Sequence, residues 1–280
     1  MKIGIFANLD KDLEGRATTA LVEFLLPRNF EVYVSEQLEC LQLPVRYCDN
    51  ATLAACDIVV VFGGDGTILR IAKECARTNA KIFAVNLGHR GFLAAVEYVE
   101  LSNIFNDIAS GNYVLDTRNL INVTAGENTY LALNEAVIAR GAQTKMLKTE
   151  VRVNGALADK YASDGVIVST PTGSTAYSLS AGGPIIAPDV NAVLITPICA
   201  HSLHSRPMVI NSDNTIWIKL LRAETYAYLN IDGDDVQKLQ SGDIFLVTKS
   251  EYSVSFIRLK KYNYYEKLLQ KMRYWSSFDK

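Results

Sequence analysis

Apolar and polar positions divide this chain into two parts with different patterns, and the change falls near residue 115. In the first part, short runs of β-branched and other apolar residues alternate with stretches that have helical spacing. Such alternation predicts a parallel sheet covered by helices. The expected strands are residues 3–7, 31–35, 58–62 and 81–85. The expected helices are residues 16–26, 67–78 and 101–110. Pro27 ends the first of these helices, and Gly111 ends the third.

The second part contains short apolar segments separated by turn residues, which is typical of a β-rich, sandwich-like domain. The expected strands are residues 121–125, 131–139, 150–153, 165–169, 192–197, 215–221, 226–231, 244–249 and 253–259. Asn154-Gly155 has the composition of a two-residue hairpin turn, one helix is expected to begin near Ser174, and residues 264–273 have amphipathic helical spacing.

These patterns predict three segments. Residues 1–115 form an α/β domain with a parallel sheet and a glycine-rich loop, residues 116–255 form a β-rich domain, and residues 256–280 form a strand and helix that pack back on the rest. The chain is long enough for two medium-sized domains, and 49% of its residues are apolar, which is sufficient for a proper core.

Charge and cysteine content narrow the function classes. The net charge is −2 with mixed signs and no basic stripe, so nucleic acid is not an expected partner. The apolar stretches have the length of strands, so no membrane span is expected, and the first residues predict a strand instead of a signal peptide. The five cysteines show no paired spacing. Buried thiols in a reducing cytosol are the favoured interpretation, which predicts a cytoplasmic location.

The first candidate for chemistry is the loop Gly63-Gly64-Asp65-Gly66-Thr67, which follows the apolar run 57–62. A glycine loop at the carboxyl end of a parallel strand lies where α/β sheets bind ligands, and the following helix start suits phosphate. An aspartate there is unusual for simple phosphate binding, but it is reasonable if Asp65 handles a proton or a metal. A tight strand-to-helix turn is an equally good explanation of this loop alone, because it has neither the lysine of the Walker pattern nor the dinucleotide spacing.

Two further clusters are polar where the surrounding pattern is apolar. Asn134-Glu135 interrupts an apolar segment, and residues 163–184 carry a hydroxyl-rich loop with a Gly-Gly-Pro turn. The small hydrogen-bonding groups of that loop suit sugar hydroxyls and amides. An edge strand explains the first cluster and an ordinary loop explains the second, but three such clusters in one chain are harder to explain in this way.

Together these clusters resemble the bacterial NAD kinases over roughly residues 1 to 275. Residues 86–93 (Asn-Leu-Gly-His-Arg-Gly-Phe-Leu) and 230–233 (Asn-Ile-Asp-Gly) are also similar to motifs of that family. The glycine-aspartate loop alone also resembles phosphofructokinases and the diacylglycerol and sphingosine kinases. The segment 169–177 (Ser-Thr-Pro-Thr-Gly-Ser-Thr-Ala-Tyr) is much more specific.

The resemblance implies transfer of a phosphoryl group to the 2′-hydroxyl of the adenosine ribose of NAD, which gives NADP. It implies Asp65 as the general base that takes the hydroxyl proton, and a phosphate site at Gly63, Gly64, Gly66 and Thr67. The donor is ATP, another nucleoside triphosphate or polyphosphate, with a divalent metal, Mg²⁺, that arrives with the donor instead of sitting in a protein cage. Assembly as a dimer or tetramer and an active site in the interdomain cleft are also implied.

The resemblance places NAD in contact with a larger set of residues. Asn134 and Glu135 hold the adenosine and its ribose, Asp164 holds a donor group, and Phe92 lines the adenine pocket. The nicotinamide end is lined by Thr175, Ala176, Tyr177 and Ser180. The whole substrate-binding set is Gly66, Phe92, Asn134, Glu135, Lys145, Ala162, Asp164, Thr175, Ala176, Tyr177, Ser178, Leu179, Ser180 and Asp234.

Two departures from the family pattern and several alternatives remain. Ala162 stands where many relatives carry arginine, and Asp234 stands where they often carry glutamine, so both contacts are open. His201 and His204 invite a metal site, but a structural loop explains them better, and no protein metal site is expected. A lipid or sugar kinase with the same loop, and a dinucleotide-binding sensor without catalysis, are the competing hypotheses.

Overall fold

The computed structural model describes residues 1–87, 91–94, 96–97, 105–108, 110–142, 145–202, 204–259 and 262–276. The chain divides into two compact units. Unit 1 comprises Met1–Thr117 and Val254–Lys280, and unit 2 comprises Arg118–Ser253. Within the described part of the chain, no helix is both long and apolar enough to cross a membrane.

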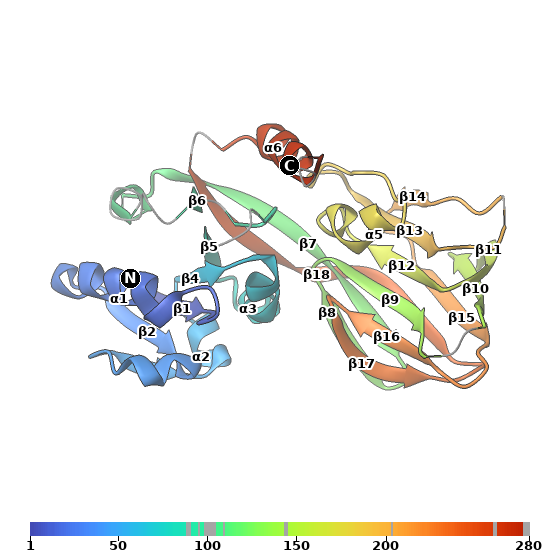
Figure 1. Cartoon of the computed structure of the whole chain (residues 1–280), viewed down its shortest axis with the longest axis horizontal. Coiled ribbons are helices and arrows are strands. Elements are labelled where there is room, and N and C mark those ends of the chain that lie inside the picture. Colours follow the sequence, from blue (N-terminus) through green and yellow to red (C-terminus); the bar gives the residue numbers. More distant parts are fainter. Residues whose placement is uncertain are drawn as a thin grey trace. The chain divides into compact units, whose positions relative to one another are not determined.

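Unit 1 contains a parallel sheet in which β1 lies between β2 and β4 (Figure 1). The end of β18 continues the sheet beyond β5, where Ser255 pairs with Lys81 and Phe256 with Ile82 in parallel register. The strands are β1 (Lys2–Ala7), β2 (Glu31–Ser35), β3 (Arg46–Cys48), β4 (Ile58–Gly63), β5 (Lys81–Asn86), β6 (Val96–Glu97) and β18 (Ile244–Leu259). The helices are α1 (Arg16–Leu25), α2 (Asn50–Ala54), α3 (Asp65–Thr78) and α6 (Tyr264–Ser276), with short 3₁₀ turns at Leu13–Gly15, Leu26–Arg28 and Glu36–Leu41.

Helices cover both faces of this sheet, which explains why its strands read as continuous apolar runs. Ile3 and Ile5 belong to the same buried cluster as Leu21 of α1. Between them Gly4 points to the other face, where a Cβ atom would lie 3.1 Å from the Leu53 side chain of α2. Because successive residues of a strand face opposite ways, both faces of β1 are buried.

The sequence predicted the main elements of unit 1, with corrections at their ends. Helix α3 begins at Asp65, two residues before the expected start, so Asp65 lies in the first helical turn. Strand β3 and helix α2 were not expected, although the Asp49 side chain caps α2 by accepting the Thr52 N–H at 2.9 Å. Of the expected helix 101–110, residues 105–108 are helical, and residues 101–104 and 109 lie outside the described residues.

Unit 2 is a sandwich of two mainly antiparallel sheets. In the first, β11, β10, β15 and the beginning of β18 are neighbours in that order, and β7 pairs with β8 and β18. In the second, the order is β14-β13-β12-β9-β16-β17, and every pair is antiparallel. The strands are β7 (Tyr113–Ala125), β8 (Asn128–Ala132), β9 (Glu135–Arg140), β10 (Leu147–Val153), β11 (Ala156–Ser163), β12 (Gly165–Ser169), β13 (Ala192–Ile198), β14 (Met208–Asn211), β15 (Ile216–Arg222), β16 (Ala227–Ile231) and β17 (Asp234–Leu239).

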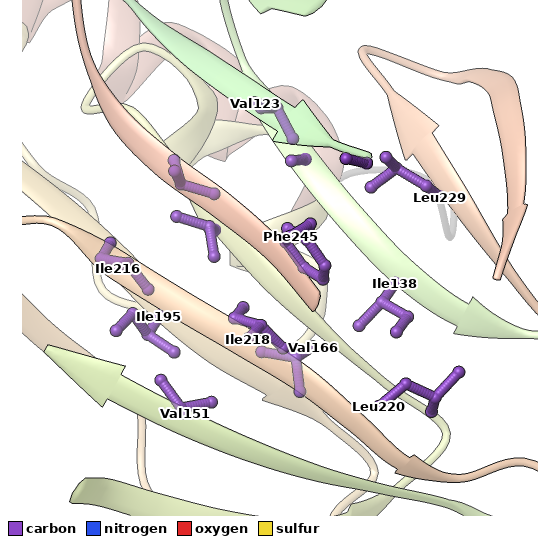
Figure 2. Packing of buried hydrophobic residues seen from close by; sticks show 14 of the residues in the cluster. Val123, Ile138, Val151, Val166, Ile195, Ile216, Ile218, Leu220, Leu229 and Phe245 are labelled. Carbon is purple, nitrogen blue, oxygen red and sulfur yellow. The ribbon is translucent and has the colours of Figure 1, made fainter. Parts of the chain in front are cut away.

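The core of unit 2 lies between its two sheets. Figure 2 shows Ile216 and Ile218 of the first sheet beside Ile195 and Val166 of the second, with Phe245 of the first sheet near them. All of these side chains are buried in one cluster. Since every second residue of each strand faces this layer, the packing is that of a β-sandwich, and the predicted combination of an α/β domain with a β-rich domain is confirmed.

Several boundaries in unit 2 differ from the prediction. The expected strand 131–139 is two strands, with Leu133 and Asn134 between them, and the expected strands 244–249 and 253–259 form the single strand β18. Strands β11, β14 and β17 were not expected. Strands β11 and β17 have a weak apolar signal because many of their positions are exposed, whereas β14 is apolar but only four residues long. The Asn154-Gly155 turn is confirmed, with positive φ at both residues (49° and 82°).

Two expected helices also differ in length. The one near Ser174 is a single 3₁₀ turn (Gly173–Thr175) followed by the four-residue α5 (Tyr177–Ser180). The C-terminal helix α6 runs to Ser276 instead of ending at 273.

Candidate functional site

The glycine loop of unit 1 connects the end of β4 to the first turn of α3. Its glycines have two different roles. A Cβ atom on Gly63 would lie 2.3 Å from Thr67 Oγ1, so this turn is too tight for a side chain. A Cβ atom on Gly64 or Gly66 would meet none of the described residues within 4 Å. The loop therefore leaves open space beside the N–H groups at the start of a helix, which is where a phosphate binds most readily.

The Asp65 carboxylate is held in a defined orientation beside this space. The N–H of Phe92 donates to Oδ2 at 2.8 Å, and the N–H of Leu93 donates to Oδ1 at 3.1 Å. A Cβ atom on Gly91 would lie only 2.0 Å from Asp65 Oδ1, so glycine is needed there for the close approach. The Asp65 side chain is still 30% exposed, so a substrate group can reach the carboxylate.

A buried arginine fixes the segment that carries these two N–H donors. The Arg258 side chain, at the end of β18, is fully buried. Its Nη1 donates to the Leu93 carbonyl at 2.7 Å, and its Nε donates to Asp116 Oδ2 at 3.0 Å. Sequence analysis did not single out Arg258. A lone arginine in the apolar segment 254–259 is the only local signal that it offers.

Phe92 and the C-terminal helix complete the surroundings of Asp65. The ammonium of Lys271, on α6, lies 3.9 Å from the centre of the Phe92 ring and 3.9 Å from Asp65 Oδ2. Burial lowers the pKa of Lys271, and the negative charge of Asp65 opposes that shift. Residues 88–90 of the predicted 86–93 motif lie outside the described residues.

In unit 2, Asn134 and Glu135 lie at the junction of β8 and β9 and are nearly buried. Asp232, in the turn between β16 and β17, holds this junction. Its Oδ1 accepts the N–H groups of Asn134 (2.8 Å) and Glu135 (3.1 Å), and its Oδ2 accepts that of Leu133 (2.9 Å). Three backbone donors on one carboxylate fix the shape of this junction. Sequence analysis quoted Asp232 in a motif but chose Asp234 as the contact.

The Glu135 carboxyl has an environment of the opposite kind. Its side chain is buried, and no described residue makes a hydrogen bond to its Oε2. Burial, with a smaller contribution from the charge of Asp232, raises the pKa of Glu135 to about 8. Glu135 is therefore mostly protonated near neutral pH, and a neutral carboxyl can donate a hydrogen bond as well as accept one.

The loop 170–173 packs against the other side of the Asn134 junction. The Thr170 hydroxyl donates to the Leu133 carbonyl at 2.6 Å, and the Thr170 N–H donates to the Asn134 carbonyl at 2.9 Å. A Cβ atom on Gly173 would lie 2.1 Å from the Asn134 carbonyl oxygen. The second and third predicted clusters are thus brought together within unit 2.

The hydroxyl groups of the following segment serve mainly its own structure. Ser174 donates to the Pro171 carbonyl at 2.6 Å, Thr175 to the Thr172 carbonyl at 3.2 Å, and the Ser178 hydroxyl shares a hydrogen bond of 2.8 Å with Thr196. Among the predicted substrate contacts of this segment, Thr175 and Ser178 are buried, Ala176 and Leu179 are half-buried, and Tyr177 and Ser180 are exposed.

The structure supplies Asp164 with a partner that the sequence did not indicate. Arg140 Nε lies 2.7 Å from Asp164 Oδ1, and Arg140 Nη2 donates to Oδ2 at 3.4 Å. Two strands of one sheet position the pair, because Arg140 ends β9 and Asp164 precedes β12. Ala162 accepts the His201 N–H through its carbonyl at 2.8 Å.

The two remaining predicted contacts lie on the surface of unit 2. Lys145 is exposed and paired with Glu224, and Asp234 is an exposed residue at the start of β17. Among the described residues, no group of three or more histidine, cysteine, aspartate or glutamate side chains could hold a metal ion.

Known proteins share both parts of this arrangement. The family model of the ATP-NAD kinase N-terminal domain matches residues 3–113, and that of the C-terminal domain matches residues 133–259. An NAD kinase of Thermoanaerobacter sp. (strain X514) is 37% identical over 278 residues, covering 97% of this chain and 98% of the relative.

Two solved structures have the same fold. The crystal structure of yeast NADH kinase complexed with NADH has a TM-score of 0.87 and 24% identity, covering 100% of this chain and 88% of that one. The crystal structure of an NAD kinase from Archaeoglobus fulgidus in complex with ATP has a TM-score of 0.79 and 25% identity, covering 98% of this chain and 99% of that one. By the match of both domains and the identity over nearly its whole length, this chain belongs to the NAD kinase family.

Proposed function

We propose that this protein transfers the γ-phosphoryl group of ATP to the 2′-hydroxyl of the adenosine ribose of NAD, giving NADP and ADP. The observation that carries this proposal is the Asp65 carboxylate, oriented by two backbone N–H groups beside the open side of the glycine loop. A binding protein has no need of an oriented, accessible carboxylate at a phosphate site. Kinase chemistry on a hydroxyl group does need one.

In this mechanism Asp65 accepts the proton of the 2′-hydroxyl as the ribose oxygen attacks the γ-phosphorus. The bond between that phosphorus and the β–γ bridging oxygen breaks, and ADP leaves with the electron pair. Help from a positioned general base contributes about 10²- to 10⁴-fold to the rate. We assign Gly63, Gly64, Gly66 and Thr67 to the donor phosphates, because open space lies beside Gly64 and Gly66 at the start of α3, and the start of a helix favours phosphate.

We assign the acceptor to unit 2. Asn134 and Glu135 bind the adenosine and its ribose, and Glu135 suits this role because its buried carboxyl can exchange hydrogen bonds with hydroxyl groups. Asp164, held by Arg140, accepts a donor group of NAD. The exposed side chains of Tyr177 and Ser180 are available to the nicotinamide end. Phe92, Lys145, Ala162 and Asp234 stay predicted contacts of NAD.

A divalent metal fits this scheme if it arrives with ATP. Mg²⁺ prefers oxygen ligands and usually combines phosphate oxygens with few protein carboxylates. The described residues offer the accessible Asp65 carboxylate beside the phosphate space and no cluster of three or more metal ligands. When bound, Mg²⁺ would offset the charge of the phosphates.

The decisive experiment is an acceptor comparison with the purified full-length chain, ATP and Mg²⁺. NADP formation is measured with an NADP-specific dehydrogenase. ADP release is measured in parallel with NAD, with an NAD analogue that has a 2′-deoxyadenosine ribose, with diacylglycerol and with glucose. We expect ADP and NADP in equal amounts from NAD, and no product from the matched analogue, which lacks only the acceptor hydroxyl.

Other outcomes would direct the assignment elsewhere. ADP release with a lipid or sugar but not with NAD would mean that the acceptor is that lipid or sugar. NAD binding without turnover would support the hypothesis of a dinucleotide-binding sensor without catalysis. A dimer or tetramer and a cytoplasmic location stay predictions. Light scattering of the purified protein tests the first, and fractionation of the source cells tests the second.

A further inference from the structure

Strands β9 and β12 bring two buried polar side chains to the same face of the second sheet of unit 2. Glu135 of β9 and Ser169 of β12 are directly opposite each other in antiparallel register. The side chains of such a pair lie on one face, with their Cβ atoms about 4.5–5.5 Å apart. Ser169 is fully buried, and Glu135 is 7% exposed. The register therefore places the Ser169 hydroxyl next to the Glu135 carboxyl.

This face is not the one that forms the core of the sandwich. Ala136, which follows Glu135, and Val168, which precedes Ser169, belong to the core cluster between the sheets. Because successive residues of a strand face opposite ways, Glu135 and Ser169 point away from that core. The next residues on their face form a separate buried cluster, and Ala181, directly after α5, packs against it. The pair thus lies on the sheet face that carries α5, the helix of several predicted substrate contacts.

Each of these two side chains has a buried oxygen atom that the rest of the described chain does not bind. No described residue makes a hydrogen bond to Glu135 Oε2 or to Ser169 Oγ. A buried polar atom without a partner is costly, so such an atom calls for a specific explanation. A hydroxyl group both donates and accepts, so it can pair with a carboxyl group in either protonation state. The register makes each of these oxygens a candidate partner of the other.

The backbone beside both side chains is fixed. The Thr170 N–H donates to the Asn134 carbonyl at 2.9 Å, and Asp232 Oδ1 accepts the Glu135 N–H at 3.1 Å. A serine side chain moves its hydroxyl by rotation about a single bond, between staggered positions. Rotation of the Ser169 side chain can therefore bring the two oxygens together without disturbing these backbone contacts.

We propose that Ser169 is a positioning residue for NAD binding: its hydroxyl pairs with Glu135 Oε2 and so turns Oε1 toward the adenosine ribose. The inference rests on the proposed function, which assigns Glu135 to that ribose. A carboxyl group held at one oxygen is ordered before the substrate arrives, so less freedom is lost on binding. Ser169 therefore contributes to the affinity for NAD and not to the chemical step.

The test compares the full-length protein with Ser169→Ala, with Glu135→Met, which removes both carboxyl oxygens but keeps the side-chain length, and with the double variant. Thr149→Val is the matched control, because Thr149 is also fully buried with a hydroxyl that no described residue binds, but lies on β10. Steady-state kinetics gives kcat and KM for NAD, calorimetry gives the Kd for NAD, and thermal unfolding gives the stability. The ¹³C signal of the Glu135 carboxyl group, recorded by NMR without NAD, needs neither turnover nor ligand.

We expect Ser169→Ala to raise the KM and Kd for NAD about fivefold, the effect of one hydrogen bond, with kcat within about twofold. Its unfolding temperature should not fall, because alanine removes a buried polar atom that no described residue binds. In the Glu135→Met background the same substitution should change kcat/KM by less than about twofold, since Ser169 then has nothing to position. The Glu135 signal should move in Ser169→Ala and stay in place in Thr149→Val.

Four outcomes would overturn the inference. They are an unchanged KM and Kd in Ser169→Ala, an equal loss of affinity with and without the Glu135 carboxyl or in Thr149→Val, an unchanged Glu135 signal in Ser169→Ala, and a Ser169→Ala chain that does not fold, which makes the residue structural. If the wild-type protein binds NAD but forms no NADP, the proposed function fails while the Kd values still decide the inference. A wild-type protein that does not bind NAD would refute both.

Discussion

Two carboxyl groups, one in each unit, show how surroundings decide what the same chemical group can do. Asp65 is 30% exposed, receives two backbone N–H donors and has a cation nearby. Glu135 is 7% exposed, has an oxygen that no described residue binds, and lies near the negative charge of Asp232. The first environment presents an oriented, accessible carboxylate, and the second favours a neutral hydrogen-bonding group. Such separated environments divide the roles of two acids in one enzyme.

The largest expected effect comes from removing the proton acceptor. Asp65→Asn should lower kcat about 10²- to 10⁴-fold, since the amide cannot take the hydroxyl proton. NAD affinity, measured by calorimetry, should change little, because the assigned NAD contacts are elsewhere. The matched control is Asp49→Asn, where asparagine still caps α2. A wild-type kcat in Asp65→Asn would remove Asp65 from the mechanism.

The second largest effect is expected from removing Asp232, whose carboxylate holds the backbone at Asn134 and Glu135. Asp232→Ala leaves the N–H groups of Leu133, Asn134 and Glu135 without their acceptor, so we expect a loss of about 2–4 kcal/mol in the free energy of unfolding. The KM for NAD should rise tenfold or more as the junction loses its shape.

Urea unfolding and steady-state kinetics measure these two consequences of Asp232→Ala. Asp235→Ala, on the exposed part of the same hairpin, is the control. If Asp232→Ala leaves the KM for NAD unchanged, the junction does not bind the dinucleotide.

A pH series examines the neutral form of Glu135 directly. Its pKa is raised from 4.5 to about 8, so the folded protein binds a proton that the unfolded chain releases over this interval. This group therefore favours folding most below pH 4.5, and its contribution falls as the pH rises toward 8, by up to about 1.4 kcal/mol per pH unit. Glu135→Gln removes that dependence because it cannot ionise.

The measurement is the difference in unfolding free energy between wild type and Glu135→Gln from pH 5 to pH 8, obtained with urea. We expect Glu135→Gln to gain stability relative to wild type as the pH rises. Glu127→Gln, at an exposed position between β7 and β8, should give a flat difference. A flat difference for Glu135→Gln as well would mean that Glu135 is ionised in the folded protein.

The smallest effect concerns the half-exposed pair of Arg140 and Asp164. Arg140→Met should change the free energy of unfolding by less than about 1 kcal/mol, because solvent screens such pairs. The KM for NAD should still rise about three- to fivefold if Arg140 orients Asp164 for the substrate. Arg152→Met removes a comparable surface pair with Glu150 and should leave the KM as it is.

Sequence patterns predicted the elements whose residues carry their own signal. The strands of unit 1 are apolar on both faces, so a segment such as Ile58–Gly63 can be recognised as a strand from its sequence. An edge strand such as β17 cannot be recognised in this way, because Asp234 and Asp235 are as polar as the residues of a loop. The start of α3 was placed two residues late for a related reason: Asp65-Gly66 has loop composition, and only the structure shows it in the first helical turn.

The same distinction applies to the candidate site. Sequence analysis named Asp65, Asn134 and Glu135 because each belongs to a local motif. Asp232, Arg140 and Arg258 were missed as supporting residues, because their partners are distant along the chain. Asp232 binds the Asn134 N–H across 98 positions, and Arg258 binds the Leu93 carbonyl across 165. No pattern of neighbouring residues carries such information.

The hydrogen bond from Arg258 to Leu93 has a consequence for biosynthesis. Domains fold as units while the chain leaves the ribosome from its N-terminus. Strands β1 to β5 emerge early. The backbone segment that orients Asp65 receives its hydrogen bond from the buried Arg258 side chain only when residue 258 has been made. A nascent or prematurely terminated chain that stops before the end of β18 can thus contain the whole glycine loop and yet lack the contact that fixes the N–H donors of Asp65. The orientation of Asp65 in this protein therefore depends on translation having passed residue 258.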